Sequence, residues 1–300
     1  MGKEPPQPCL DTLTPVITAR SRRSEQERGA LNKLPEDFSA TAIAEIRNRL
    51  DDVRSSGARV LFAIESGSRA WGFPSPDSDY DCRFIYARSA KQHLVLKQAR
   101  DVLEYPIIGD IDAGGWDLRK ALLLALDGNA VVSEWARSLI VYEEETSFRP
   151  RFVALLDKIV DPALAARHYL GLARTQLYRM GDLEGEINLK KLFYVIRPLI
   201  ALAWMEQRSF DKLPPMNLQD CLAEANLSPE IEDEIRTMIA EKALTREMGT
   251  GRAPESIATY ILKRFAEFAD GLPTPQFHAD IRLQNYALAE EFYTREVELA

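Results

Sequence analysis

The sequence has few cysteines and no long hydrophobic run, and each absence excludes a class of protein. No stretch approaches the roughly 18–20 apolar residues that a helix needs to cross a bilayer, and the opening MGKEPPQPCL has no apolar segment of secretory type. We therefore expect no membrane association. The three cysteines, Cys9, Cys82 and Cys221, form neither a zinc spacing nor a disulfide framework. Such cysteine usage fits a reducing compartment, and a cytoplasmic location is predicted.

A basic surplus and the common nucleotide-binding motifs are also missing. The formal net charge is −8, which argues against a general nucleic-acid binder, although a local basic patch would still be compatible with RNA. The absence of a Gly-x-x-x-x-Gly-Lys-Ser/Thr run excludes a P-loop kinase. His93, His168 and His278 lack the spacing of metal ligands, so we interpret them as structural or surface residues.

Three stretches of different character divide the chain. Residues 1–34 are rich in Pro, Arg and Ser and lack sustained periodicity, which predicts a flexible N-terminal arm. Residues 35–148 combine short apolar runs of strand type with helical patterns, whereas residues 149–300 are mostly of helical period. Early strands and late helices predict an α+β fold, in which a mixed β-sheet with flanking helices precedes a C-terminal helical domain.

The individual elements follow from apolar periodicity and from turn residues. Strands are expected at residues 60–64, 80–86, 102–103 and 107–111. Helices are expected at residues 38–53, 118–126, 134–142, 151–160, 163–180, 189–207, 218–225, 229–247, 256–269 and 280–300.

The strongest chemical signal is a Gly-Ser turn followed by two aspartates. Gly67 allows the backbone to come close to a phosphate, while Ser68 offers a hydroxyl and an amide as donors. Asp79 and Asp81 are two residues apart at the entrance of an expected strand, so both carboxylates project from one face. Two such carboxylates repel each other unless a cation lies between them, and Mg²⁺ with substrate phosphates is the expected occupant. A pair of Mg²⁺ ions could activate an attacking oxygen and stabilise the leaving pyrophosphate.

This combination resembles the signature of the polymerase-β-like nucleotidyltransferase superfamily, in which Gly-Ser is followed, about ten residues later, by Asp-x-Asp. The string GSRAWGFPSPDSDYDCRFIY is similar, more narrowly, to YcgL/RlaP-type nucleotidyltransferases. Residues 112–120, 128–129 and 134–135 look like the family's strand-to-helix segment, and residues 190–198 look like its helical block. The resemblance covers roughly residues 58–220.

The resemblance implies an Mg²⁺-dependent enzyme that transfers a nucleoside monophosphate from an NTP, with ATP expected, to a hydroxyl acceptor. It also implies a third catalytic and metal-binding carboxylate beside Asp79 and Asp81. Asp112 is favoured for that role; Asp117, which also fits a helix N-cap, and Asp110 are the alternatives. RNA, such as tRNA, is the first expectation for the acceptor. A protein AMP-transferase of a toxin–antitoxin-like system and a non-catalytic nucleotide-binding module are the alternative functions.

Further nucleotide ligands are expected on both sides of the site. Arg69 follows the Gly-Ser turn and could contact a phosphate. Lys190, Tyr194 and Arg197 share one helix face, and the resemblance favours them as ligands of a triphosphate or of an RNA end. Trp71 is a candidate for stacking on the nucleobase. An ordinary surface or core role is the alternative for each of these residues.

Overall fold

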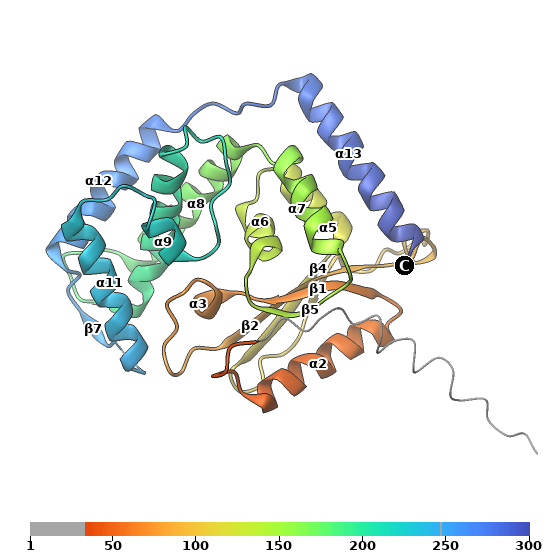
Figure 1. The fold of residues 1–300 in the computed structure, drawn as a ribbon, viewed down its shortest axis with the longest axis horizontal. Helices are drawn as coiled ribbons and strands as arrows, with labels where there is room; N and C mark the ends of the chain where they lie inside the picture. The colour runs from red at the N-terminus through yellow and green to blue at the C-terminus, as the bar shows by residue number, and fades with distance from the viewer. Residues whose placement is uncertain (1–33, 247) are drawn as a thin grey trace, which may run out of the picture.

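A five-stranded β-sheet organises the N-terminal half of the chain, and helices make up most of the rest (Figure 1). The fold is therefore α+β, as the sequence predicts. This computed structural model describes residues 34–246 and 248–300. Apart from Leu34, the predicted flexible arm lies outside the described residues. No helix within the described ranges is long and apolar enough to cross a membrane.

The sheet has the strand order β3-β4-β2-β1-β5. Its strands are β1 (Arg59–Glu65), β2 (Tyr80–Ala87), β3 (Val102–Glu104), β4 (Ile111–Asp117) and β5 (Val141–Glu144). The pairing of β2 with β4 is parallel, whereas the other pairings are antiparallel. The parallel pair matters for function because it brings the beginnings of β2 and β4 to the same edge of the sheet.

Helices cover both faces of the sheet (Figure 1). One face is covered by α2 (Ala40–Ser55), and the other by α5 (Leu118–Leu126), α6 (Ala130–Arg137) and α7 (Phe148–Ile159). Phe84 and Tyr86 of β2 belong to the apolar cluster under α2, while Ile85 and Ala87 belong to the cluster on the opposite face. Successive strand residues point to opposite faces of the sheet. A sheet that is covered by helices on both faces therefore requires apolar residues at successive strand positions.

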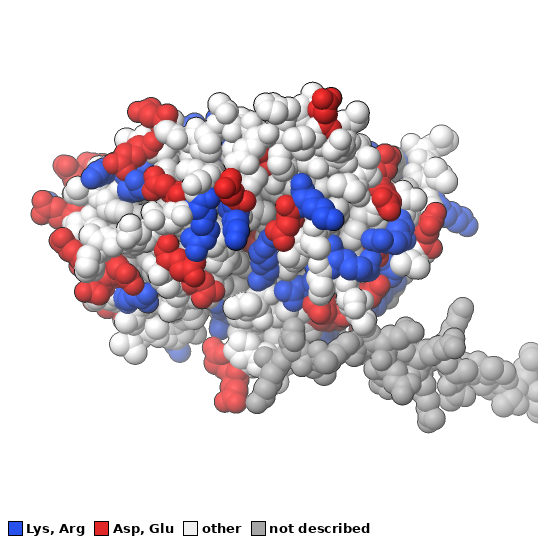
Figure 2. Space-filling model, turned by 45° about the horizontal axis from the view of Figure 1, so that its top comes forward, with Lys and Arg blue, Asp and Glu red and all other residues white. Residues whose placement is uncertain are grey.

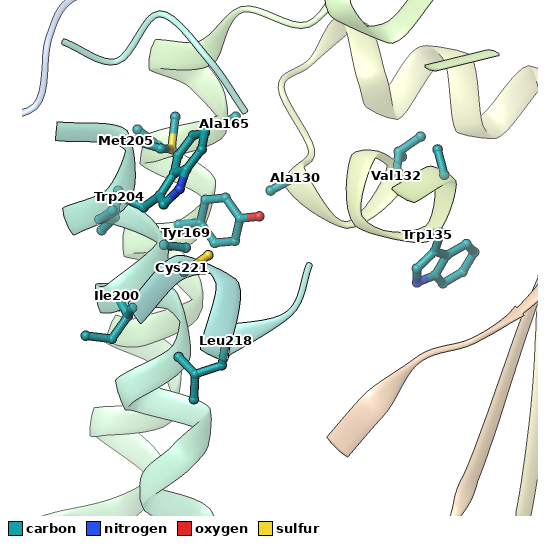
Figure 3. Packing of buried hydrophobic residues seen from close by; sticks show 14 of the residues in the cluster. Ala130, Val132, Trp135, Ala165, Tyr169, Ile200, Trp204, Met205, Leu218 and Cys221 are labelled. Carbon is teal, nitrogen blue, oxygen red and sulfur yellow. The ribbon is translucent and has the colours of Figure 1, made fainter. Parts of the chain in front are cut away.

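The second half of the chain is built around one apolar helix. Every residue of α9 (Leu189–Glu206) from Val195 to Met205 is buried, as expected for a helix that is surrounded by others. The remaining long helices are α8 (Pro162–Met180), α11 (Pro229–Leu244), α12 (Glu255–Gly271) and α13 (Ala279–Glu298). The short elements are α3 (Gly67–Ala70), α4 (Ala90–His93), α10 (Leu218–Leu222), β6 (Ile187–Asn188) and β7 (Thr250–Gly251). In Figure 3, Tyr169 of α8 points its hydroxyl toward α6, beside Ala130.

The last helix packs on the sheet half of the molecule. α13 lies against α5 and α7 (Figure 1). Its Glu296 is fully buried and forms ion pairs with Arg59 of β1 and Arg151 of α7. One hydrophobic cluster joins the sheet to the helices that follow it. Residues 149–300, predicted as one helical domain, therefore include a helix that covers the sheet half.

Two local predictions are wrong. A helix was expected over residues 134–142, but α6 ends at Arg137 and strand β5 begins at Val141. The apolar run there fits either period, and Ser138 separates the two elements by donating its hydroxyl to the Glu65 carbonyl at 2.7 Å.

The second error concerns residues 107–111, which were expected to form a strand. Ile107 and Ile108 are exposed, Ile108 forms only an isolated β-bridge with Ile111 across the turn at Gly109 and Asp110, and β4 begins only at Ile111. Strand β4 was not predicted because it contains Gly114 and Gly115, and glycine is a poor strand former. A Cβ on Gly115 would stand 2.2 Å from the Phe84 ring, so close packing explains this glycine.

Candidate active site

The beginnings of β2 and β4 bring the predicted carboxylates together. In the parallel register Asp81 pairs with Asp112, so their side chains leave neighbouring strands on the same face. Asp79 stands two residues before Asp81 at the entrance of β2 and is exposed. The three residues predicted as catalytic and metal-binding thus lie at one edge of the sheet.

An arginine that sequence analysis missed lies between two of these carboxylates. Arg83 donates to Oδ2 of Asp112 at 2.6 Å and to Oδ1 of Asp81 at 3.3 Å. Burial raises the pKa of Asp81; Arg83 opposes this effect, while the charges of Asp112 and Asp79 add to it. The signal was present in the sequence, because Arg83 follows Asp81 by two residues and so shares its strand face.

The fit of this site to a metal ion can be judged from its donors. As the side chains stand, no group of three Asp, Glu, His or Cys residues within residues 34–246 and 248–300 could hold a metal ion. Arg83 instead supplies the positive charge near Asp81 and Asp112. The carboxylate donors nevertheless suit Mg²⁺, which commonly takes one or two carboxylates and completes its octahedron with water and substrate phosphates. A cation would also relieve the repulsion that helps to raise the pKa of Asp81.

The Gly-Ser turn packs directly on Asp81. Gly67 opens α3 with φ +59°, and a Cβ built on it would stand only 1.7 Å from Oδ2 of Asp81. The amide of Ser66 donates to the Asp81 carbonyl at 2.8 Å and fixes the turn to β2. Glycine is therefore required at position 67 by its backbone conformation and by its neighbour.

Ser68 and Arg69 hold the segment that leads to Asp79. The Ser68 hydroxyl donates to Oγ of Ser78 at 2.8 Å. Arg69 donates to the carbonyls of Ser78 and Asp79 at 2.8 and 3.2 Å, and its guanidinium lies 4.3 Å from the Tyr80 ring centre. These contacts give both residues a role in shaping the loop. Their direct contact with a phosphate stays a prediction.

Two of the three predicted residues on α9 lie beside aspartates of this region, Lys190 beside Asp77 and Tyr194 near Asp79 and Asp81. Lys190 places its amine 3.3 Å from both carboxylate oxygens of Asp77. Burial raises the pKa of Tyr194, and the charges of Asp81 and Asp79 add to this effect. Tyr194 also meets the Trp71 ring edge-on, with centroids 5.8 Å apart. The helical half therefore forms one wall of the site.

Arg197 lies deeper and has other partners. It is only 7% exposed and forms an ion pair with Glu134 of α6. Tyr169 donates its hydroxyl to the same carboxylate oxygen at 2.8 Å, and the Arg197 guanidinium lies 4.3 Å from the Trp71 ring centre. The expected contact of Arg197 with phosphate does not fit this burial. Trp71, the candidate for base stacking, is correspondingly packed between protein side chains.

The alternatives for the third carboxylate occupy other positions. Asp117 caps α5, accepting from the Arg119 amide at 2.9 Å and from Arg88 at 3.1 Å, at the far end of β4 from Asp112. Asp110 lies in the turn before β4. Of these three aspartates, only Asp112 pairs with Asp81 in the sheet register.

A buried glutamate holds the backbone of Asp81 through a hydrogen bond. Glu65 is completely buried and accepts from the Asp81 amide at 3.0 Å, while the hydroxyl of Tyr142 donates to its other oxygen. Burial raises the pKa of Glu65 to about 8, against the lowering effect of these two hydrogen bonds. Tyr142 was missed because residues 134–142, which include the start of β5, were predicted as a helix.

Comparison with known proteins assigns the family. Residues 42–288 match the model described as RlaP, the RNA repair pathway DNA polymerase beta family. The chain belongs to this family. Over 197 residues it is 38% identical to the uncharacterized protein YcgL of Bacillus subtilis strain 168, an alignment that covers 65% of this chain and 74% of that protein.

Membership in the RlaP family confirms the resemblance inferred from the Gly-Ser and Asp-x-Asp motifs. This RlaP-family chain also resembles the crystal structure of a nucleotidyltransferase-like protein from Exiguobacterium sibiricum 255-15, with a TM-score of 0.28 and 11% identity. That match covers 84% of this chain and 78% of the other.

Proposed function

We propose that this chain is a nucleotidyltransferase that transfers a nucleoside monophosphate from an NTP, with ATP favoured, to a hydroxyl acceptor and releases pyrophosphate. The observation that carries the proposal is the pairing of Asp81 with Asp112 across parallel strands, with Gly67 packed against the Asp81 carboxylate. Asp79 stands at the entrance of the same strand. The description of the family as polymerase beta supports the same reaction class.

Each side chain has a role in this reaction. Asp79, Asp81 and Asp112 would hold Mg²⁺, which when bound supplies charge neutralisation at the phosphates and a more acidic acceptor hydroxyl. One of the three carboxylates accepts the proton of the attacking hydroxyl. Gly67 and Ser68 bring backbone N–H groups toward the triphosphate.

The helical wall completes the binding of the triphosphate. Lys190, which rests on Asp77 at the rim, exchanges this partner for a phosphate oxygen. Tyr194 lies beside it on α9. Arg83 keeps Asp81 and Asp112 aligned, and Arg197 acts indirectly by holding α6 against α9 through Glu134.

RNA is the proposed acceptor, and the word "RNA" in the description of the family supports it. The surface is compatible with this choice despite the formal charge of −8. Lys and Arg side chains gather across the middle of the face in Figure 2, interspersed with Asp and Glu. Local basic groups of this kind can contact a phosphate backbone.

The decisive experiment incubates the chain with each labelled NTP, Mg²⁺ and either tRNA or a cell lysate. Label on RNA supports the proposal, and label on a protein band would favour the AMP-transferase alternative. Nucleotide binding without transfer would favour a non-catalytic module. The Asp79→Asn/Asp81→Asn double variant should fold normally and lose transfer, so full activity in this variant would refute the mechanism.

A further inference from the structure

The loop that follows the Gly-Ser turn is fastened to the helical half through its backbone. We define the nucleotide loop as Gly67–Phe73. The carbonyl of Trp71 accepts from the amide of Leu218 at 2.9 Å, and the carbonyl of Gly72 accepts from the Gln219 side chain at 2.8 Å. Both donors belong to α10. Two successive carbonyls are thus held by one short helix.

The third carbonyl of this run is held by a buried lysine of α11. Lys242 is 1% exposed and donates from its amine to the carbonyl of Phe73. The amine also lies 5.2 Å from the ring centre of Phe73 and 6.0 Å from that of Phe193. Among the described residues, no carboxylate forms an ion pair with Lys242. Burial of an ammonium group without an ionic partner is costly, so its contacts with the loop require an explanation.

The loop carries this contact onward to the Gly-Ser turn. The amide of Phe73 donates to the carbonyl of Ser68 at 3.1 Å, so the peptide units around Phe73 connect the Lys242 amine to the residue expected to meet the phosphates. A shift of Phe73 would therefore move Ser68. Gly67 could not follow freely, because it already lies against Asp81.

We propose that Lys242 is a positioning residue for nucleotide binding, which holds the nucleotide loop in the conformation that presents Gly67 and Ser68 to the triphosphate. The inference rests on the proposed nucleotidyltransferase function. It assigns the helical half a second role besides forming a wall, since α10 and α11 together fix three consecutive carbonyls of the loop.

The test compares Lys242→Met, which keeps the apolar stem and removes the donor, with Lys191→Met, which removes the same charge from an exposed position of α9. Binding of ATP with Mg²⁺ is measured by calorimetry, and backbone hydrogen exchange is followed over residues 67–73. Lys242→Met should weaken ATP binding about tenfold, the size of one charge-assisted hydrogen bond, and should accelerate exchange in the loop. Lys191→Met should leave loop exchange at the wild-type rate.

The outcomes separate this inference from the proposed function. A wild-type chain that binds ATP, together with unchanged affinity and loop exchange in Lys242→Met, overturns the positioning role alone. A wild-type chain that binds no nucleoside triphosphate overturns both the positioning role and the proposed function. Lowered global stability with an unchanged ratio of loop exchange to global exchange would make Lys242 a purely structural residue and would also overturn the inference.

Discussion

The carboxylate of Asp81 occupies the space where a side chain at position 67 would begin, because a Cβ on Gly67 would stand 1.7 Å from its Oδ2. Gly67→Ala must therefore displace either the turn or the carboxylate. We expect transfer to fall at least 100-fold, since a catalytic group displaced by about 1 Å can cost that much. Steady-state kinetics with the acceptor that becomes labelled in the NTP incubation would measure the loss.

A matched control separates this overlap from the strain of the backbone. Gly109 also has positive φ, at +62°, but no atom lies within 4 Å of the position of its Cβ. Gly109→Ala should cost about 1 kcal/mol of stability and leave transfer unchanged. Equal activity losses in the two variants would contradict the steric explanation.

The identity of the third carboxylate gives a second prediction. Asp112→Asn should abolish transfer and preserve the fold, because Asp112 faces Asp81 and is partly exposed. Asp117→Ala should instead destabilise the protein by roughly 1–2 kcal/mol through loss of the cap of α5, while activity per folded molecule persists. Urea unfolding and transfer assays on both variants would distinguish the two roles. Loss of transfer in the Asp117 variant, with transfer kept in the Asp112 variant, would make Asp117 the third carboxylate.

Arg83 should compete with the metal ion for the carboxylates. Removal of its charge in Arg83→Met leaves Asp81 and Asp112 without their present cation, so Mg²⁺ alone should raise the unfolding midpoint of this variant more than that of the wild type. Thermal scans with and without Mg²⁺ measure the difference. Adding Asp81→Asn and Asp112→Asn should eliminate the gain; if it persists, Mg²⁺ binds elsewhere.

Lys242 predicts a pH dependence of stability. Burial, aided by the charge of nearby Lys190 and opposed by that of Asp77, lowers the pKa of Lys242 from 10.5 to about 8. Between pH 8 and 10.5 the unfolded chain then binds more protons than the folded one, so the wild type gains stability as pH rises. Relative to Lys242→Met, the gain should approach roughly 3 kcal/mol. Urea titrations at several pH values would measure this difference, and a constant value would contradict the prediction.

The buried pair of Arg197 and Glu134 predicts a large coupling. Arg197→Met alone should cost about 3–5 kcal/mol, because Glu134 keeps a buried charge without its ionic partner. The double variant Arg197→Met/Glu134→Gln should cost less than the sum of the single changes. Additive losses in this cycle would instead indicate that the two residues act independently.

Sequence patterns predicted those parts of the molecule that depend on local spacing. α5 begins and ends at the expected residues, and Asp117 caps it as its position suggested. Asp79 and Asp81 lie at the entrance of β2 because a two-residue period and a preceding turn are enough to place them. The α+β class followed from the order of strand and helix patterns.

The remaining features depend on contacts between distant segments. The alignment of Asp112 with Asp81 is a property of strand register, and no local pattern in Gly114-Gly115 announces a strand. The roles of Glu65 and Arg197 depend on partners 77 and 63 residues away. Lys242 carries no motif, so only the folded chain shows that it reaches the nucleotide loop.

The ion pair of Arg59 with Glu296 has a consequence for synthesis of the chain. Arg59 lies in β1 and Glu296 in α13, 237 positions further along the chain. During translation the sheet can form before α13 leaves the ribosome, so the cover over α5 and α7 arrives later than the sheet itself. Until then Phe148 and Phe152 lack the ring of Phe292, so the nascent chain exposes an apolar surface that chaperones can bind.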